Sequence, residues 1–191
     1  DLTLYLLLDT SRSLAFGSPL SKLDVAKRVA AALGYVGLTG SERVSVVPFS
    51  STLSPPLPPG RGSRRVGGML RYLDALEANG TTDLSRAVDQ FLARSPRPGL
   101  VAVISDLLDP SGYERAIDRL AGEKHEPAIF HVLDQDELDP QPGGDLVLVD
   151  SERGARVDVT LDARAVRAYR ARVVAFLEGA AAYAKKRGFS Y

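Results

Sequence analysis

A short polar stretch near the start of the chain carries oxygen-bearing side chains at alternate positions. Asp9, Ser11 and Ser13 directly follow the apolar run 2–8. Alternate residues of a tight loop can point the same way, so the stretch can present one carboxylate and two hydroxyls together. Such oxygens are ligands for a hard divalent cation. The chemistry that these residue types predict is therefore cation binding.

Two further oxygen-bearing residues occur in comparable settings. Asp106 follows a second apolar run, 100–104, and Thr82 lies in a loop just before a predicted helix. In an open sheet of parallel strands, ligands collect beyond the carboxyl ends of the strands. If the strands that precede Asp9 and Asp106 are neighbours, all three loops meet at one edge of the sheet.

The elements that must position these residues alternate between strands and helices. Apolar runs at 2–8 and 100–104 predict central strands that are covered on both faces. Further strands are expected at 44–49 and 128–133, with a short edge strand within 50–59 and a hairpin of 146–149 and 156–159. This alternation predicts an α/β fold with a doubly wound, mainly parallel sheet flanked by helices.

Helix boundaries are predicted from capping residues. Ser21 with Asp24, and Ser111 with Glu114, have the spacing of capping boxes. The first helix is expected to end near residue 38, and a second to stop at 79–80, where Asn-Gly is a C-terminal signal. A third helix is expected from residue 84, and a long last helix should end at Gly188.

Composition limits the classes of protein and partner. With 191 residues, a single domain over 1–191 is expected, excised from a longer chain. The 24 basic and 24 acidic residues cancel, so no overall field draws the protein to nucleic acid or to a membrane surface. The absence of cysteine excludes disulfides and thiolate metal sites. No apolar run is long enough for a spanning helix, and no signal peptide is visible.

The order and strand context of the five oxygen-bearing residues resemble a known fold. The pattern Asp-x-Ser-x-Ser, a distant Thr and a distant Asp is similar to the metal-ion-dependent adhesion site of the von Willebrand factor A fold. More closely, the runs 7–14, 43–50, 80–84 and 104–106 resemble the bacterial family catalogued as domain of unknown function 58. Residues 125–134, the late hairpin and the long C-terminal helix fit that family too, so the resemblance covers nearly the whole chain.

The resemblance implies a role for each site residue. Ser11 and Ser13 would ligate Mg²⁺ directly, and Thr82 would do so directly or through water. Asp9 and Asp106 would hold coordinated waters. Mn²⁺ or Ca²⁺ could take the place of Mg²⁺. Neutral hydroxyl ligands leave Mg²⁺ strongly electrophilic, and an open position would attract an Asp or Glu of a partner. The expected function is non-enzymatic protein binding.

The same resemblance implies a setting for this activity. It points to work alongside a MoxR-type AAA+ ATPase. Because the net charge is zero, no contact of these residues with nucleic acid or a membrane is expected. A cytoplasmic location is expected, with room for a membrane tether in segments outside this stretch.

Other interpretations of the site residues stay open. Asp9 and Asp106 commonly cap helices and loops, which would leave a scaffold with no metal in use. A Mg²⁺-dependent phosphohydrolase with Asp9 as nucleophile is the enzymatic alternative, but haloacid-dehalogenase-like enzymes need a second Asp where this chain has Ser11. Arg12 replaces the small residue expected between the two serines, and it either steers a partner's carboxylate or is simply solvated.

Several other polar groups are expected to be structural rather than functional. Solvation is favoured over ligand binding for the arginines near the proline-rich turn and for an acidic stretch without EF-hand spacing. Packing or surface positions are favoured for the two histidines, which lack a zinc motif. The residues are Arg61, Arg64, Arg65, Asp134, Asp136, Glu137, Asp139, His125 and His131.

Overall fold

A five-stranded sheet lies at the centre of the computed structural model, which describes residues 2–94, 97–141 and 143–191. Its strand order is β3-β2-β1-β4-β5, and only β3 runs antiparallel to its neighbour. The strands are β1 (Thr3–Asp9), β2 (Arg43–Phe49), β3 (Leu57–Arg61), β4 (Leu100–Ser105) and β5 (Glu126–His131). The predicted doubly wound, mainly parallel sheet is confirmed.

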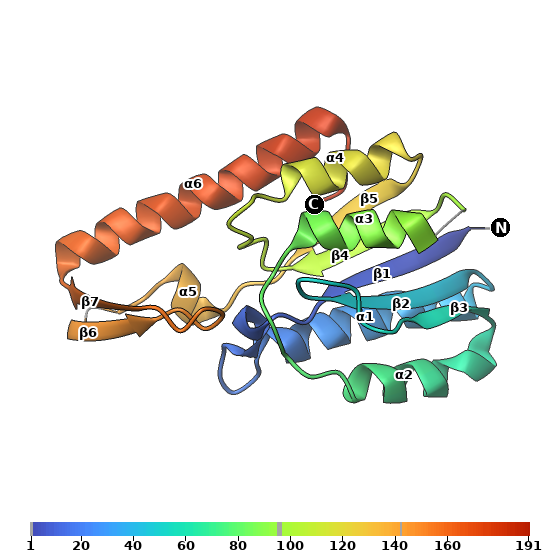
Figure 1. Ribbon diagram of the computed structural model, residues 1–191, viewed down its shortest axis with the longest axis horizontal. Coiled ribbons are helices and arrows are strands. Elements are labelled where there is room, and N and C mark those ends of the chain that lie inside the picture. The colour runs from blue at the N-terminus through green and yellow to red at the C-terminus, as the bar shows by residue number, and fades with distance from the viewer. Residues whose placement is uncertain (1, 95–96, 142) are drawn as a thin grey trace.

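Helices cover both faces of this sheet (Figure 1). Packing places α1 and α2 on one face, and α3, α4 and the end of α6 on the other. The helices are α1 (Lys22–Thr39), α2 (Val66–Asp74), α3 (Leu84–Arg94), α4 (Glu114–Gly122), α5 (Gln135–Leu138) and α6 (Ala163–Arg187), with 3₁₀ turns η1 (Arg12–Ala15) and η2 (Ser63–Arg65).

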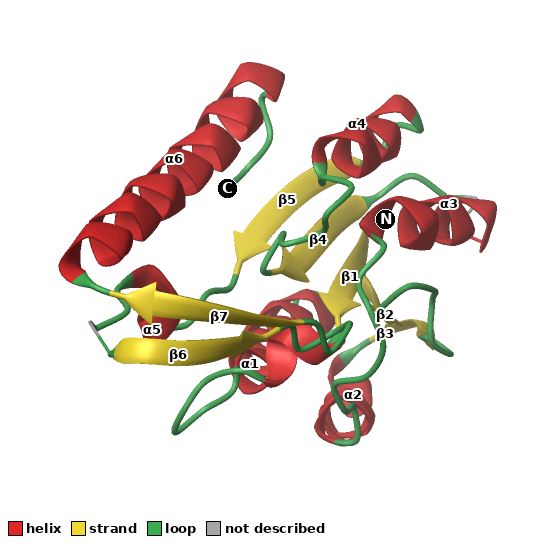
Figure 2. Ribbon diagram, turned by 60° about the vertical axis from the view of Figure 1, so that its left-hand side comes forward, coloured by secondary structure: helices red, strands yellow, loops and turns green. Residues whose placement is uncertain are grey.

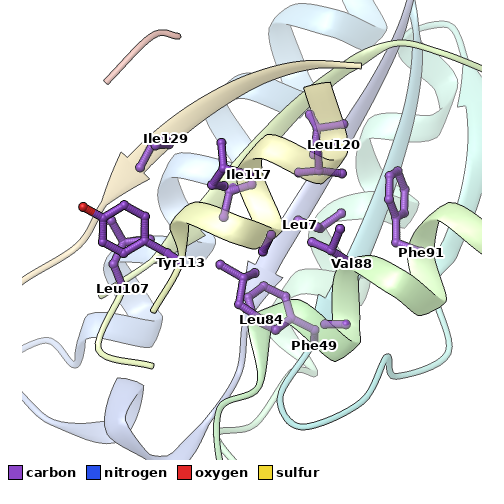
Figure 3. Packing of buried hydrophobic residues seen from close by; sticks show 14 of the residues in the cluster. Leu7, Phe49, Leu84, Val88, Phe91, Leu107, Tyr113, Ile117, Leu120 and Ile129 are labelled. Atoms are coloured by element: carbon purple, nitrogen blue, oxygen red, sulfur yellow. The ribbon is translucent and has the colours of Figure 1, made fainter. Parts of the chain in front are cut away.

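Strand β1 explains why the sheet is buried on both faces. Its side chains alternate, so that Leu6 and Leu8 pack towards α1 while Tyr5 and Leu7 pack towards α3 and α4. In Figure 3, Leu7 lies among the apolar side chains of α3 and α4. A strand covered on both faces needs a nearly continuous apolar sequence, which is the pattern of residues 2–8.

The start of α1 is fixed by the predicted capping box. The Ser21 hydroxyl accepts a hydrogen bond from the Asp24 backbone N–H at 3.1 Å, and the Asp24 carboxylate accepts from the Ser21 N–H at 3.0 Å. Two orphan donors of the first helical turn are thereby satisfied. The prediction for this helix, including its end near residue 38, is confirmed.

Two local predictions are wrong, and the predicted edge strand is confirmed with shifted bounds. Helix α2 ends at Asp74 rather than at 79–80, because residues 79 and 80 hydrogen-bond to the loop after β1 instead. Helix α4 starts after Tyr113 without a side-chain cap, since the Ser111 N–H donates to Asp109 Oδ1 at 2.7 Å in a preceding turn. The edge strand β3 lies at 57–61, later than most of the predicted stretch 50–59.

The late hairpin forms a second, separate sheet. Strands β6 (Gly144–Val149) and β7 (Arg156–Leu161) pair antiparallel, as predicted. The long helix α6 then leads back to the main sheet, ends at Gly188 in the left-handed conformation (φ 74°), and buries Ala180 and Ala184 near its end. Figure 2 shows the turn of the hairpin pointing towards the carboxyl end of β1 and the start of α1. Among the described residues, no helix has both the length and the apolar character needed to cross a membrane.

Candidate functional site

The loops that carry the candidate site residues meet at the carboxyl edge of the sheet. Strands β1 and β4 are direct neighbours, as the predicted convergence of the three loops at one edge of the sheet requires. Asp9 is the last residue of β1, Asp106 follows the last residue of β4, and both are fully buried at 0% exposure. Two carboxylates are therefore held side by side beneath the edge of the sheet.

Both oxygens of Asp9 are engaged. Oδ1 accepts from the Ser11 backbone N–H at 2.9 Å, and Oδ2 accepts from the Ser105 hydroxyl at 2.7 Å. Burial, and next the negative charge of Asp106, raise the pKa of Asp9 to about 7, against smaller lowering effects of these hydrogen bonds. Asp9 thus anchors the loop after β1 to the end of β4, and its charge is poorly compensated by the groups around it.

The two serine hydroxyls lie together. Ser11 Oγ and Ser13 Oγ are 3.0 Å apart, with Ser11 buried and Ser13 half-buried. The 3₁₀ turn η1 follows Ser11 directly and brings the alternate side chains to one side, while the side chain of Arg12 between them is exposed. Adjacent ligands of an octahedral Mg²⁺ at roughly 2.0–2.1 Å lie about 2.9 Å apart. The spacing of the two hydroxyls therefore fits a pair of adjacent ligands.

The loop that carries Thr82 lies against the loop after β1. The Asn79 N–H donates to the Thr10 carbonyl at 2.7 Å, and the Arg12 N–H donates to the Gly80 carbonyl at 3.0 Å. Gly80 adopts φ 79°, a conformation that favours glycine. These bonds place Thr82 beside the serine loop, where its N–H and hydroxyl donate to the Glu152 carboxylate at 3.0 and 2.8 Å.

Asp106 is paired with a buried lysine. Its Oδ1 accepts from the Leu108 N–H at 3.1 Å, and its Oδ2 lies 2.8 Å from Lys22 Nζ, which also contacts Glu137 Oε1 at 2.7 Å. Burial lowers the pKa of Lys22, but the two carboxylates outweigh this effect and leave the pKa above its ordinary value. A charged ammonium group therefore lies next to the candidate site.

Sequence reasoning missed four residues of this region. Ser105, Lys22, Glu137 and Glu152 all contact the predicted residues or their partners. Only Ser105 had a sequence signal, since it precedes Asp106 directly. The interpretation of Glu137 as part of a solvated acidic stretch is wrong, because its side chain pairs with the buried Lys22, while Asp134 caps α5.

The histidines and arginines lie where structural roles are expected. His125 is buried against Tyr5 and Phe91, and burial lowers its pKa. His131 Nε2 lies 2.9 Å from the Asp106 carbonyl, and burial likewise lowers its pKa. Arg64 and Arg65 are exposed. The packing role predicted for His125 is confirmed.

The donor set of the site is made of hydroxyls as much as carboxylates. In residues 2–94, 97–141 and 143–191, no group of three or more His, Asp or Glu side chains is placed to hold a metal ion. The candidate site differs from such clusters because Ser11, Ser13 and Thr82 would supply neutral oxygens, with Asp9 and Asp106 behind them. Its composition suits a hard cation such as Mg²⁺.

Comparisons with known proteins agree with this fold. Uncharacterised proteins of Mycobacterium bovis and Mycobacterium tuberculosis are 30% identical over 193 residues, which cover 95% of this chain and 61% of theirs. The chain thus spans less than two thirds of the length of these relatives.

Solved structures with the same fold are more distant. A conserved hypothetical protein BatB of Bacteroides thetaiotaomicron has a TM-score of 0.60 at 18% identity, covering 91% of this chain and 86% of that one. A manganese-loaded TRAP protein of Plasmodium vivax has a TM-score of 0.50 at 20% identity, covering 69% and 57%. The family described as "Protein of unknown function DUF58" matches residues 1–176, and this chain belongs to it.

Proposed function

We propose that this protein is a non-enzymatic interaction module that binds an acidic side chain of a partner protein through Mg²⁺. The observation that carries the proposal is the pair of hydroxyls of Ser11 and Ser13, 3.0 Å apart at the carboxyl edge of the sheet. Thr82 lies in the adjoining loop, and Asp9 and Asp106 lie behind. A protein of the same fold from Plasmodium vivax is manganese-loaded, which supports a divalent cation here.

The chemistry of binding follows from the ligands. Hydroxyl groups do not neutralise a divalent cation, so the bound ion would keep a strong attraction for a carboxylate from outside. Asp9 and Asp106 have partners on each oxygen and would act on the ion through water. Such carboxylates orient ligands and tune the metal without filling its coordination sphere.

Binding is favoured over a phosphoryl-enzyme mechanism by the environment of Asp9. A nucleophilic carboxylate must reach its substrate, whereas Asp9 has 0% exposure and both of its oxygens accept hydrogen bonds. Ser11 also stands where the haloacid-dehalogenase-like enzymes carry their second Asp. We therefore propose no covalent chemistry for this site.

The first test measures metal binding directly. Calorimetric titration with Mn²⁺ or Mg²⁺ should give a single site, and Ser11→Ala should weaken its affinity by about 10- to 100-fold. Ser63→Ala removes an exposed serine hydroxyl and should leave the affinity unchanged. Equal affinity in the Ser11→Ala variant would contradict the proposal, as would phosphatase turnover that Asp9→Ala abolishes.

The partner that the family resemblance suggests is a MoxR-type AAA+ ATPase. Capture of that ATPase by the full protein should be lost with EDTA and restored by excess Mg²⁺. Ser11→Ala should reproduce the effect of EDTA, with Ser63→Ala as the matched control. Capture that is indifferent to chelation would argue against a metal bridge.

A further inference from the structure

The turn of the late hairpin places a carboxylate on the candidate site. Glu152 lies 70 residues from Thr82 in the sequence, yet its two oxygens accept from the Thr82 N–H at 3.0 Å and from the Thr82 hydroxyl at 2.8 Å. Its neighbours Ser151 and Arg153 are exposed, whereas Glu152 is half-buried. One side chain of the turn is thus directed into the site.

The turn itself is well defined. Asp150 Oδ1 accepts from the Glu152 and Arg153 N–H groups at 2.8 and 3.0 Å, and the Asp150 carbonyl accepts from the Gly154 N–H at 2.8 Å. Gly154 has φ 70°, which favours glycine at this point. These bonds hold the backbone of Glu152 so that its side chain can extend towards Thr82.

Apolar packing does not account for the position of the hairpin. The strands expose their large side chains, with Leu148 at 53% and Val157 at 58% exposure. The hairpin extends from the main sheet in both ribbon views, and only its turn points to the loops after β1 (Figures 1 and 2). The contact of Glu152 with Thr82 fixes the turn of the hairpin against the body of the protein, and this contact is polar and reversible.

We propose that Glu152 is an internal ligand, which occupies the place of the partner's carboxylate until the hairpin is displaced. This inference rests on the proposed function, because it concerns the same site. Thr82 offers two donors to an anion, and Glu152 uses both. Thr82 is also one of the proposed ligands of the ion, so a carboxylate held on Thr82 lies where an Asp or Glu of a partner would approach that ion, and the two carboxylates compete.

Competition within one chain is effective because the competitor is tethered. A flexible short connection gives an effective concentration of about millimolar. The apparent affinity for a partner is the intrinsic affinity multiplied by the fraction of molecules in which the hairpin is open. A partner must therefore either bind tightly or make further contacts that displace the hairpin, and the site discriminates against small free carboxylates.

The test uses a peptide of residues 149–156 as the competing carboxylate, added to the full protein with Mg²⁺. Binding is followed by NMR at the Thr82 amide. Glu152→Gln keeps the shape of the side chain and removes its charge, and Glu152→Ala removes both acceptors. We expect both variants to bind the peptide about tenfold more tightly than the unaltered protein. Asp158→Asn, which removes an exposed carboxylate from the same hairpin, should bind like the unaltered protein.

A second readout needs neither metal nor peptide. In Glu152→Ala the Thr82 amide loses its acceptor, so its hydrogen exchange should be about tenfold faster than in the unaltered protein, and unchanged in Asp158→Asn. Circular dichroism confirms that each variant is folded before it is compared.

The outcomes separate this inference from the proposed function. If the unaltered protein and Glu152→Gln bind the peptide equally well, and EDTA abolishes binding to both, the internal ligand is overturned while the metal bridge is supported. A gain in Glu152→Gln that EDTA does not affect would support the internal ligand and contradict the metal bridge. No binding to any variant would overturn both.

Discussion

A buried lysine is the least expected residue of this site. Lys22 follows the N-cap of α1, where a charged side chain normally points to solvent, yet its side chain is 1% exposed and pairs with Asp106 and Glu137. Its ammonium group compensates one of the two buried carboxylates. Within the part of the chain that the structure describes, no cationic side chain is paired with Asp9, so a divalent ion beside it would compensate its charge.

Removing this cation should be strongly destabilising. In Lys22→Met, Asp106 would stay buried and unpaired, and we expect the free energy of unfolding in urea to fall by about 3–5 kcal/mol. Lys186→Met, at an exposed position of α6, should change it by less than about 0.5 kcal/mol. Asp106→Asn in the Lys22→Met background should recover part of the loss. Unchanged stability in Lys22→Met would refute the buried pair.

The contrast between predicted and missed residues has a physical origin. Asp9, Ser11 and Ser13 were predictable because a single strand and the loop after it set their positions. Lys22 meets its partners across 84 and 115 residues of sequence, and Glu152 meets Thr82 across 70. No local pattern encodes which of many charged residues on loops will meet, so only the folded chain reveals these contacts.

At the scale of elements, the site depends on how closely β1 and β4 approach. Gly99 precedes β4, and a Cβ atom added there would lie 2.3 Å from the Thr3 carbonyl oxygen. That neighbour is backbone and cannot rotate away. The close approach of the chain at this glycine therefore sets the start of β4 beside β1, and with it the relative positions of Asp106 and Asp9.

Gly99→Ala should test this dependence. The strands would have to separate at this end, and we expect a loss of about 1–3 kcal/mol in stability, seen as a lower Tm. Gly122→Ala, where an added Cβ meets nothing within 4 Å, is the matched control and should keep the Tm or raise it. If Gly99→Ala melts like the control, the close approach does not limit the packing of β4.

Elements were predictable where local chemistry decides them. Strand β1 and the start of α1 followed from an apolar run and a capping box. The end of α2 and the start of α4 did not, because Asn79 and Ser111 form their backbone hydrogen bonds with Thr10 and Asp109 rather than with a helix. The signal of Asn-Gly or of Ser-x-x-Glu is the same whether a helix or a neighbouring loop uses it.

At the scale of the whole molecule, the structure divides into a body and an arm. The body contains the five-stranded sheet with α1 to α4 and the end of α6, and it holds both core clusters. The arm contains α5, the hairpin and the first half of α6, where Val166 is buried but belongs to neither cluster. Glu152 joins the arm to the body at the candidate site.

This division predicts two classes of amide hydrogen exchange. Amides of β1 and β4 should exchange only through global unfolding, whereas those of β6, β7 and the start of α6 should exchange through local opening, several orders of magnitude faster. Mass spectrometry of peptic peptides from the native protein measures both classes. Glu152→Ala should accelerate exchange in the hairpin while leaving β1 unchanged, because the lost contact joins the turn of the hairpin to Thr82 and does not involve the hydrogen bonds of the main sheet. Protection of the hairpin equal to that of β1 would show instead that arm and body unfold as one unit.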